Sequence, residues 1–224
     1  MPNEPVISVR GEAFIEVEPE IAVVWISVMA RDKDRRRAVE LLADRTKLIT
    51  GQIKEYGDAV EKLASGRVSV RPEFREGKPR ERVAGYVAEA GITATVADFS
   101  VLGELVAGLA GSDMVAVTGP DWRLRPASPV FREARLAAAQ DAMQRARDYA
   151  EAFGGTVTGP TEAADTGMLT EARPQRPVMA ARALARQAAP LAADQPEFDL
   201  EPAKQTVSAQ VEARFTMTAP TLGQ

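Results

Sequence analysis

The chain has 224 residues, of which 45% are hydrophobic and 27% charged, and its net charge is −4. This composition supplies enough apolar material for one large domain or two small ones, and it lacks the basic excess of a nucleic-acid-binding protein. The chain has no cysteine and no histidine, which excludes disulfides, thiolate and imidazole metal ligands, and Ser-His-Asp or Cys-His catalysis.

The N-terminal part of the chain predicts two strands and a helix. Residues 7–17 alternate between apolar and polar side chains, with Phe14 as the one break, which predicts a half-buried strand. Residues 21–30 are apolar on both faces, which predicts a central strand covered on both sides of its sheet. We expect Asp32 to cap a helix whose apolar side chains recur every three or four residues, and Gly57 to end it in a left-handed conformation.

A hairpin is predicted after this helix. Its strands are expected at 68–74 and 82–96, joined by the turn Glu76-Gly77-Lys78-Pro79. The second strand carries mainly small side chains on one face, so we expect a helix to lie close to it. Gly85 in this strand indicates a close approach of another part of the backbone, because a strand glycine often has that role.

Two further helices are predicted on either side of a bent strand. A short amphipathic helix follows Asp98 and ends near Gly111, and a strand at 114–124 is expected to bend at Gly119-Pro120. The next helix, at 130–153, has an alanine at every fourth position, which allows a helix to pack closely on a sheet. These alanines are Ala134, Ala138, Ala142, Ala146 and Ala150.

The C-terminal part predicts two strands separated by a long excursion. A strand is expected at 156–166, and residues 206–217 alternate cleanly between apolar and polar side chains. Residues 167–202 are rich in proline, alanine and arginine, and we expect a flexible excursion there. The element order is therefore β-β-α-β-β-α-β-α-β-β. We predict an α/β (α+β) fold with a mixed, mainly antiparallel sheet and three helices packed largely on one side.

Candidate catalytic residues are few. The chain has no GxGxxG, Walker A or GxSxG sequence. Glu16, Glu18 and Glu20 could bind a cation or serve a carboxylate-dependent hydrolase, although such a row is more often the hydrated face of a sheet. We assign no catalytic, cofactor-binding or metal-binding residue, and we expect no enzyme activity because the usual proton-transfer groups are absent.

Other conspicuous side chains are interpreted as structural. The basic cluster beginning at Arg31 is diluted by acidic neighbours and predicts a solvated helix face. Trp25 and Trp122 are expected in the core or at a sheet edge, and not as a stacking platform for nucleic acid. A Ser-Lys catalytic pair would need a shielded lysine, whereas three lysines are expected to be exposed. They are Lys62, Lys78 and Lys204.

Several motifs in their order along the chain resemble the SIMPL-domain family, over a single domain at about residues 5–218. They are Val9-Arg10-Gly11-Glu12-Ala13, Val17-Glu18-Pro19-Glu20-Ile21-Ala22, Gly85-Tyr86-Val87-Ala88, Glu133-Ala134-Arg135-Leu136-Ala137-Ala138 and the final strand at 207–215. The resemblance implies a compact mixed α/β fold that sometimes assembles into homo-oligomeric rings, with no established catalysis. Its members include bacterial periplasmic and outer-membrane immunogenic proteins.

Two features depart from that family. Many members carry a signal peptide, whereas the first ten residues here lack a basic region followed by an apolar stretch, so we expect a cytoplasmic protein. The family often has a Pro-Gly turn before the last strand, where this chain reads Glu201-Pro202-Ala203-Lys204.

Three functions remain open from the sequence. The first is a self-assembling structural or interaction protein, a homo-oligomer that pairs through exposed strand edges. The second is a binding module for a small ligand or a protein partner, for example in stress response, in which 167–202 orders on binding. The third is the carboxylate-dependent hydrolase. We expect no cofactor, no nucleic-acid partner and no membrane span, because no apolar run is long enough.

Overall fold

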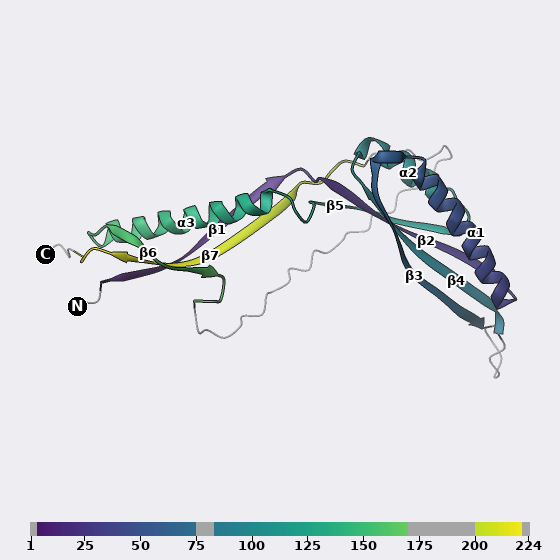
Figure 1. Cartoon of the computed structure of the whole chain (residues 1–224), viewed down its shortest axis with the longest axis horizontal. Coiled ribbons are helices and arrows are strands. Elements are labelled where there is room, and N and C mark those ends of the chain that lie inside the picture. Colours follow the sequence, from purple (N-terminus) through teal and green to yellow (C-terminus); the bar gives the residue numbers. More distant parts are fainter. Residues whose placement is uncertain (1–3, 75–82, 170–199, 221–224) are drawn as a thin grey trace, which may run out of the picture. The chain divides into compact units, whose positions relative to one another are not determined.

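The computed structural model describes residues 4–74, 83–169 and 200–220 (Figure 1). The described strands and α-helices follow the order β-β-α-β-β-α-β-α-β-β, which confirms the predicted sequence of elements and fold class. They form two sheets, with strand orders β1-β7-β6 and β3-β4-β2-β5. The elements are β1 (Val6–Val17), β2 (Ile21–Asp32), α1 (Arg35–Lys54), η1 (Gly57–Ala59), β3 (Val60–Phe74), β4 (Val83–Val96), η2 (Phe99–Val101), α2 (Leu102–Ala110), β5 (Val115–Arg123), α3 (Val130–Ala152), β6 (Val157–Asp165) and β7 (Gln205–Met217).

The described chain divides into two compact units. The three-stranded unit contains β1, α3, β6 and β7, and the four-stranded unit contains the elements from β2 to β5. The four-stranded unit is thus inserted between the first strand and the helix of the other unit. Leu200, which precedes β7, packs against the core of the four-stranded unit.

The four-stranded unit is an antiparallel sheet with its helices on one face (Figure 1). β2 pairs with β4 on one side and with β5 on the other, which confirms its central position. Its helix-facing side chains are fully buried against α1 and α2. The core cluster includes Ala22, Val24, Ile26, Val28 and Ala30 of β2, Ala38, Leu42, Ile49 and Ile53 of α1, and Leu102, Leu105, Val106 and Leu109 of α2.

The prediction that β2 is covered on both faces is wrong. Both helices of this unit pack on the same face, so no helix among the described residues of the unit covers the opposite face. Trp25 on that face keeps 38% of its surface exposed. The guanidinium carbon of Arg123 on β5 lies 5.3 Å from the Trp25 ring centroid, so a cation–π contact partly covers the ring.

The start of α1 also differs from the prediction. Asp34, and not Asp32, is the N-cap, because its side chain accepts a hydrogen bond from the Arg37 amide at 2.9 Å. Strand β2 continues through Asp32, whose carboxylate accepts from the Asp34 amide at 2.8 Å. The predicted left-handed conformation of Gly57 is confirmed, with φ of 55°, although α1 ends three residues earlier and Gly57 opens η1.

The three-stranded unit is built around close contact between α3 and β1. All five alanines of the predicted ridge on α3 are buried. Opposite them, a Cβ on Gly11 would approach the Ala138 carbonyl oxygen most closely and would lie 2.5 Å from the Ala142 amide nitrogen. A glycine is therefore required at this position of β1, because the helix backbone occupies the space of a side chain.

Strand β7 holds the beginning of the predicted excursion. Glu212 is buried on β7, and its carboxylate accepts from Arg10 at 3.0 Å and from the Leu169 amide at 3.3 Å. Arg214 donates to the Leu169 carbonyl at 2.9 Å. The remainder of the predicted excursion, 170–199, and the predicted turn at 76–79 lie outside the described residues. None of the helices in the described ranges is long and apolar enough to cross a membrane.

Candidate functional site

The outer strands of the two sheets differ in how accessible their edges are. β5 is interrupted by Pro120 and β6 by Pro160, and proline cannot donate to a strand ladder. On β1, the Glu12 amide donates to the Asp141 carboxylate of α3 at 2.9 Å. Arg145 holds that carboxylate at 2.8 Å. The side chain of a helix therefore occupies part of the β1 edge, which is one way in which proteins prevent edge pairing.

The β3 edge is the most accessible of the four. β3 has 15 residues and pairs only with β4 within the described chain, and its single proline, Pro72, is the third residue from its end. A bulge between Ser65 and Val68 bends the strand. Val68, next to this bulge, keeps 64% of its surface exposed. The outer edge of β3, at residues 60–71, is thus a free edge with an apolar side chain at its middle.

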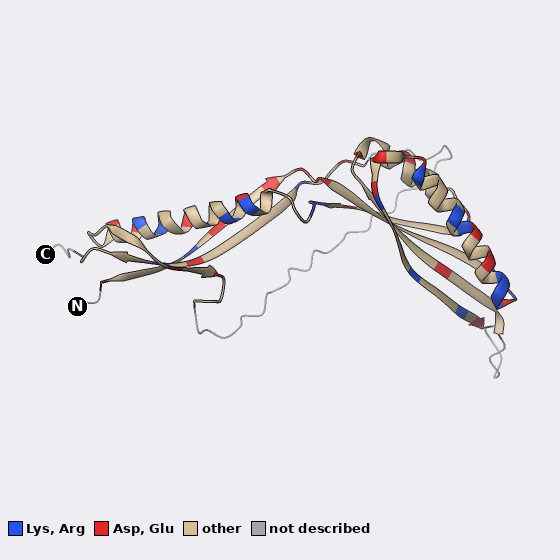
Figure 2. Ribbon diagram, in the orientation of Figure 1, with Lys and Arg blue, Asp and Glu red and all other residues tan. Residues whose placement is uncertain are grey.

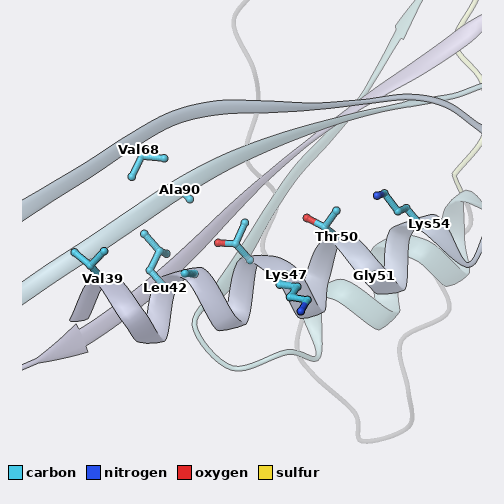
Figure 3. Close-up of a pocket in the computed structure, with 10 residues that line it drawn as sticks. Val39, Leu42, Lys47, Thr50, Gly51, Lys54, Val68 and Ala90 are labelled. Carbon is cyan, nitrogen blue, oxygen red and sulfur yellow. The ribbon is translucent and has the colours of Figure 1, made fainter. Parts of the chain in front are cut away.

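A groove of about 620 Å³ runs between α1 and the strands β3 and β4. At one end it is apolar, since Val68 and Ala90 lie across from Val39 and Leu42 (Figure 3). Val39 is 43% exposed, so apolar surface remains accessible to solvent on both walls. This groove arises because α1 packs mainly over β2 and β4, which leaves the edge strand β3 only partly covered.

The other end of the groove is polar. It is lined by Thr46, Lys47, Thr50 and Lys54, all on α1. The Lys54 side chain extends toward Thr50, whereas the Lys47 side chain is directed away from Val68 and Ala90 (Figure 3). The hydroxyl oxygen of Thr46 is buried and has no hydrogen-bond partner within the described part of the chain. Buried hydroxyl groups almost always have a partner, so this one requires an explanation.

The sheet face opposite the described helices of the four-stranded unit carries a second, smaller hollow of about 480 Å³. Glu89 on β4 lines it, and the Glu89 carboxylate accepts from the Ser27 hydroxyl at 2.8 Å and from Arg71 at 3.5 Å. Trp25 also lines this hollow. Because the carboxylate is already held by two donors, this hollow is a polar surface and offers no obvious free general base.

The predicted carboxylate row does not converge. Glu20 accepts from the Arg125 amide at 2.9 Å, and Glu18 lies 3.8 Å from the Lys204 ammonium. Glu16 belongs to the three-stranded unit and the other two to the four-stranded unit. No group of three or more acidic side chains in the described part of the chain could hold a metal ion.

Perturbed titratable groups are also explained by local contacts. Burial raises the pKa of Tyr56 at the end of α1, and the charge of the Glu104 carboxylate on α2 raises it further. A hydrogen bond to Glu61 raises the pKa of Arg125. These shifts strengthen the ordinary charge states at neutral pH, so neither residue becomes a better acid or base there.

Most of the residues that we interpreted as structural occupy the expected places. The prediction for Trp25 is wrong, because it lies on the central strand β2 and keeps 38% of its surface exposed. In the basic cluster, Arg36 and Arg37 pair with Glu40 and remain exposed, and Figure 2 shows both charge signs interspersed along α1. Trp122 packs against the core at the edge strand β5, with its ring centroid 4.9 Å from that of Phe99. Lys62 and Lys204 are exposed, and Lys78 lies outside the described residues.

The groove was missed from the sequence. Thr46 fits the apolar stripe of α1 by its spacing, so the sequence alone predicts that it faces the core. One feature of the sequence could have indicated the groove. Lys47, Thr50 and Lys54 are three and four residues apart, so they form a second, polar stripe on the same helix. Only the incomplete cover of β3 turns this stripe into the wall of a groove.

Comparisons with known proteins agree with the motifs. The SIMPL family model, described as a protein of unknown function (DUF541), matches residues 7–215. The 26 kDa periplasmic immunogenic protein of Brucella melitensis biotype 1 is 24% identical over 156 residues. That match covers 66% of this chain and 61% of the Brucella protein, so it spans about three fifths of the relative. The name of that relative assigns it to the periplasm, whereas the sequence of this chain predicts a cytoplasmic location.

Proposed function

Because the chain belongs to the SIMPL family, whose function is unknown, we propose that it is a non-enzymatic interaction protein that self-assembles through the outer edge of β3. The absence of histidine and cysteine supports a non-enzymatic role, since these residues supply most proton-transfer and nucleophilic groups. The carboxylates of Glu20, Glu89 and Glu212 are also engaged by donors.

The free edge of β3 is the observation that carries this proposal. An edge strand presents unpaired amide and carbonyl groups that can pair with a strand of another chain. In the described structure, the edges of β1, β5 and β6 are interrupted by a side-chain contact or by proline, whereas residues 60–71 of β3 are not. The bulge near Val68 bends β3, so we expect a partner strand to pair on one side of the bulge.

Solution mass and hydrogen exchange test this proposal together. Light scattering across a dilution series of the full chain should show a mass above the monomer, and the β3 amides should exchange more slowly in the associated form. The amides of β2, which pair on both sides, serve as the internal control. A monomer at all concentrations contradicts the proposal, and so does an oligomer in which exchange at β3 is unchanged.

Position 67 offers a matched pair of variants. Arg67 lies in the bulge and has no register partner on β4, so Arg67→Pro removes a backbone amide of the edge strand at a position without a β3–β4 register pair. We expect Arg67→Pro to weaken association, while Arg67→Ala, which loses only the side chain, associates like the wild type. Equal association of both variants with the wild type would count against pairing at this edge.

A second function, a binding module for a small ligand, is favoured by the groove beside α1. Ligand pockets are typically of about 300–1,000 Å³ and are mainly apolar with a few polar groups, and the groove has both properties. Thermal unfolding of the full chain with a panel of small amphiphiles tests this function, because a ligand that binds the folded state raises the Tm.

A further inference from the structure

We propose that the groove between α1 and β3 binds a single-chain amphiphile with an anionic head, of the fatty-acid class. This inference rests on the second proposed function, a small-ligand binding module, and is independent of self-assembly. The groove offers an apolar channel at one end and, at the other, two lysines without an ion-pair partner among the described residues. An anionic amphiphile likewise has an apolar chain at one end and a charged head at the other.

The apolar end fits a hydrocarbon chain. Val68 and Val39 face the groove from opposite walls and are 64% and 43% exposed, and Leu42 and Ala90 lie between them at its base (Figure 3). A hydrocarbon chain along these side chains would remove apolar surface of both walls from water, which is favourable. The wall residues are aliphatic and carry no hydrogen-bonding side chain, so an extended chain without polar atoms fits this end better than a peptide does.

The polar end fits an anionic head. Among the described residues, no carboxylate lies within ion-pairing distance of Lys47 or Lys54, whereas Arg36 and Arg37 on the same helix both pair with Glu40. The two lysines are seven residues apart on one face of the helix, with Thr50 between them. The Lys54 side chain already extends toward Thr50, and the flexible stem of Lys47 allows its ammonium group to turn toward the same anion (Figure 3).

The Thr46 hydroxyl supplies a third contact. Its oxygen is buried and has no hydrogen-bond partner in the described chain. It lies one residue before Lys47 and lines the groove, between the apolar and the polar ends. Because the oxygen is buried, the Thr46 side chain must rotate toward the groove before its hydroxyl can donate to a carboxylate oxygen, and this donation would satisfy a group that has no partner among the described residues.

The roles of the two lysines can be separated. Lys54 is in the last turn of α1, where a cation is favoured by the helix dipole whether or not a ligand is bound. Lys47 is two turns earlier, where the dipole has little effect. A loss of binding on changing Lys47 is therefore attributable to the ligand, and Lys47→Glu is the decisive variant.

Calorimetric titration of the full chain with laurate, below its micellar concentration, tests the inference. Dodecanol and dodecyltrimethylammonium, which have the same chain length without the negative charge, are the ligand controls. We expect laurate to bind at least about tenfold more tightly than either. Lys47→Glu and Val68→Asp should each weaken laurate binding by about tenfold. Thr46→Val, which replaces the hydroxyl with a methyl group, should weaken it less while leaving the Tm unchanged or higher.

Two matched variants control for charge and for apolar surface. Lys62→Glu inverts a charge on β3 away from the groove, and Leu48→Asp changes a side chain of α1 that is 62% exposed and does not line it. Both should bind laurate like the wild type. The inference is overturned if laurate does not bind, if dodecanol binds equally well, or if Lys47→Glu binds like the wild type.

A second copy of the chain in the groove would give a different result. Val68→Asp would then lower the solution mass and laurate would not bind, which overturns the inference. A failure of the self-assembly proposal appears instead as a monomeric mass and leaves the laurate titrations unchanged. The two proposals can therefore fail separately.

Discussion

Gly11→Ala should strongly destabilise the three-stranded unit. The added Cβ would lie 2.5 Å from the amide nitrogen and 2.8 Å from the Cβ of Ala142, and it would be closest to the carbonyl oxygen of Ala138. Real Cβ contacts essentially never fall below 3.0 Å. The helix α3 must therefore move by at least 0.5 Å to relieve the Ala142 nitrogen alone, and farther for the Ala138 oxygen.

The expected magnitude follows from that displacement. A gap of about 0.5–1 Å removes roughly a quarter to a half of each pairwise attraction between packed atoms. The five buried alanines of α3 all depend on close contact, and overpacking of a core typically costs about 1–3 kcal/mol. We expect a loss near 3 kcal/mol, because the atoms in the way are backbone, and this lowers the Tm by roughly 12–24 °C for a unit of this size.

Thermal unfolding followed by circular dichroism measures this loss, with Gly108→Ala as the matched control. A Cβ on Gly108 in α2 meets nothing within 4 Å, so the same chemical change there should stabilise the helix by about 1 kcal/mol. Ala142→Gly should not rescue Gly11→Ala, since the two closest atoms are backbone and remain in place. A decrease of less than about 2 °C for Gly11→Ala would refute the close contact between α3 and β1.

Three further predictions concern other contacts. Gly85→Val should lower the free energy of unfolding by about 1–3 kcal/mol, because a Cβ at this position would lie 2.9 Å from a backbone carbonyl oxygen of β2. Urea unfolding measures this loss, and Gly159→Val is the control because a Cβ there meets nothing within 4 Å. Asp34→Ala should cost about 1 kcal/mol in the same assay through loss of the N-cap of α1, and an unchanged unfolding midpoint would contradict this role. Hydrogen bonds from the backbone amide at position 167, from the Arg10 side chain and from the Leu169 amide lower the pKa of Glu212. Its stabilising contribution is therefore present above the usual glutamate pKa of about 4.3 and is lost as the pH falls through the lower folded value. The NMR shift of the Leu169 amide should titrate with a midpoint below about 4.3, and a titration that persists in Glu212→Gln would rule out this carboxylate as its cause.

Local sequence patterns predicted most elements, because the spacing of apolar residues indicates which side chains lie on the buried face of a strand or helix and which lie on the exposed face. The alternation near the C-terminus predicted β7 and its buried face, apart from Glu212. The alanine ridge predicted α3 and its contact with a sheet. By contrast, residues 60–67 of β3 lack alternation, so the strand was predicted to begin only at 68, whereas pairing with β4 extends it back to Val60.

The candidate site was less predictable than the fold. The sequence indicated free strand edges but could not rank them, because the contact of Asp141 with Glu12 joins residues far apart in the chain. The groove likewise depends on how far α1 extends over β3. Thr46 and Lys47 alone are ordinary residues of an amphipathic helix.

The sequence by itself determined the order of the elements, the family, the need for glycine in strands, and the lack of histidine and cysteine chemistry. Each of these depends on residue type and local spacing, which are explicit in the chain. Only the tertiary structure decided that the strands form two sheets, that β2 is covered on one face, and that β3 remains a free edge beside a groove. These features depend on which distant segments pair and on where a helix stops covering a sheet, and no local pattern contains that information.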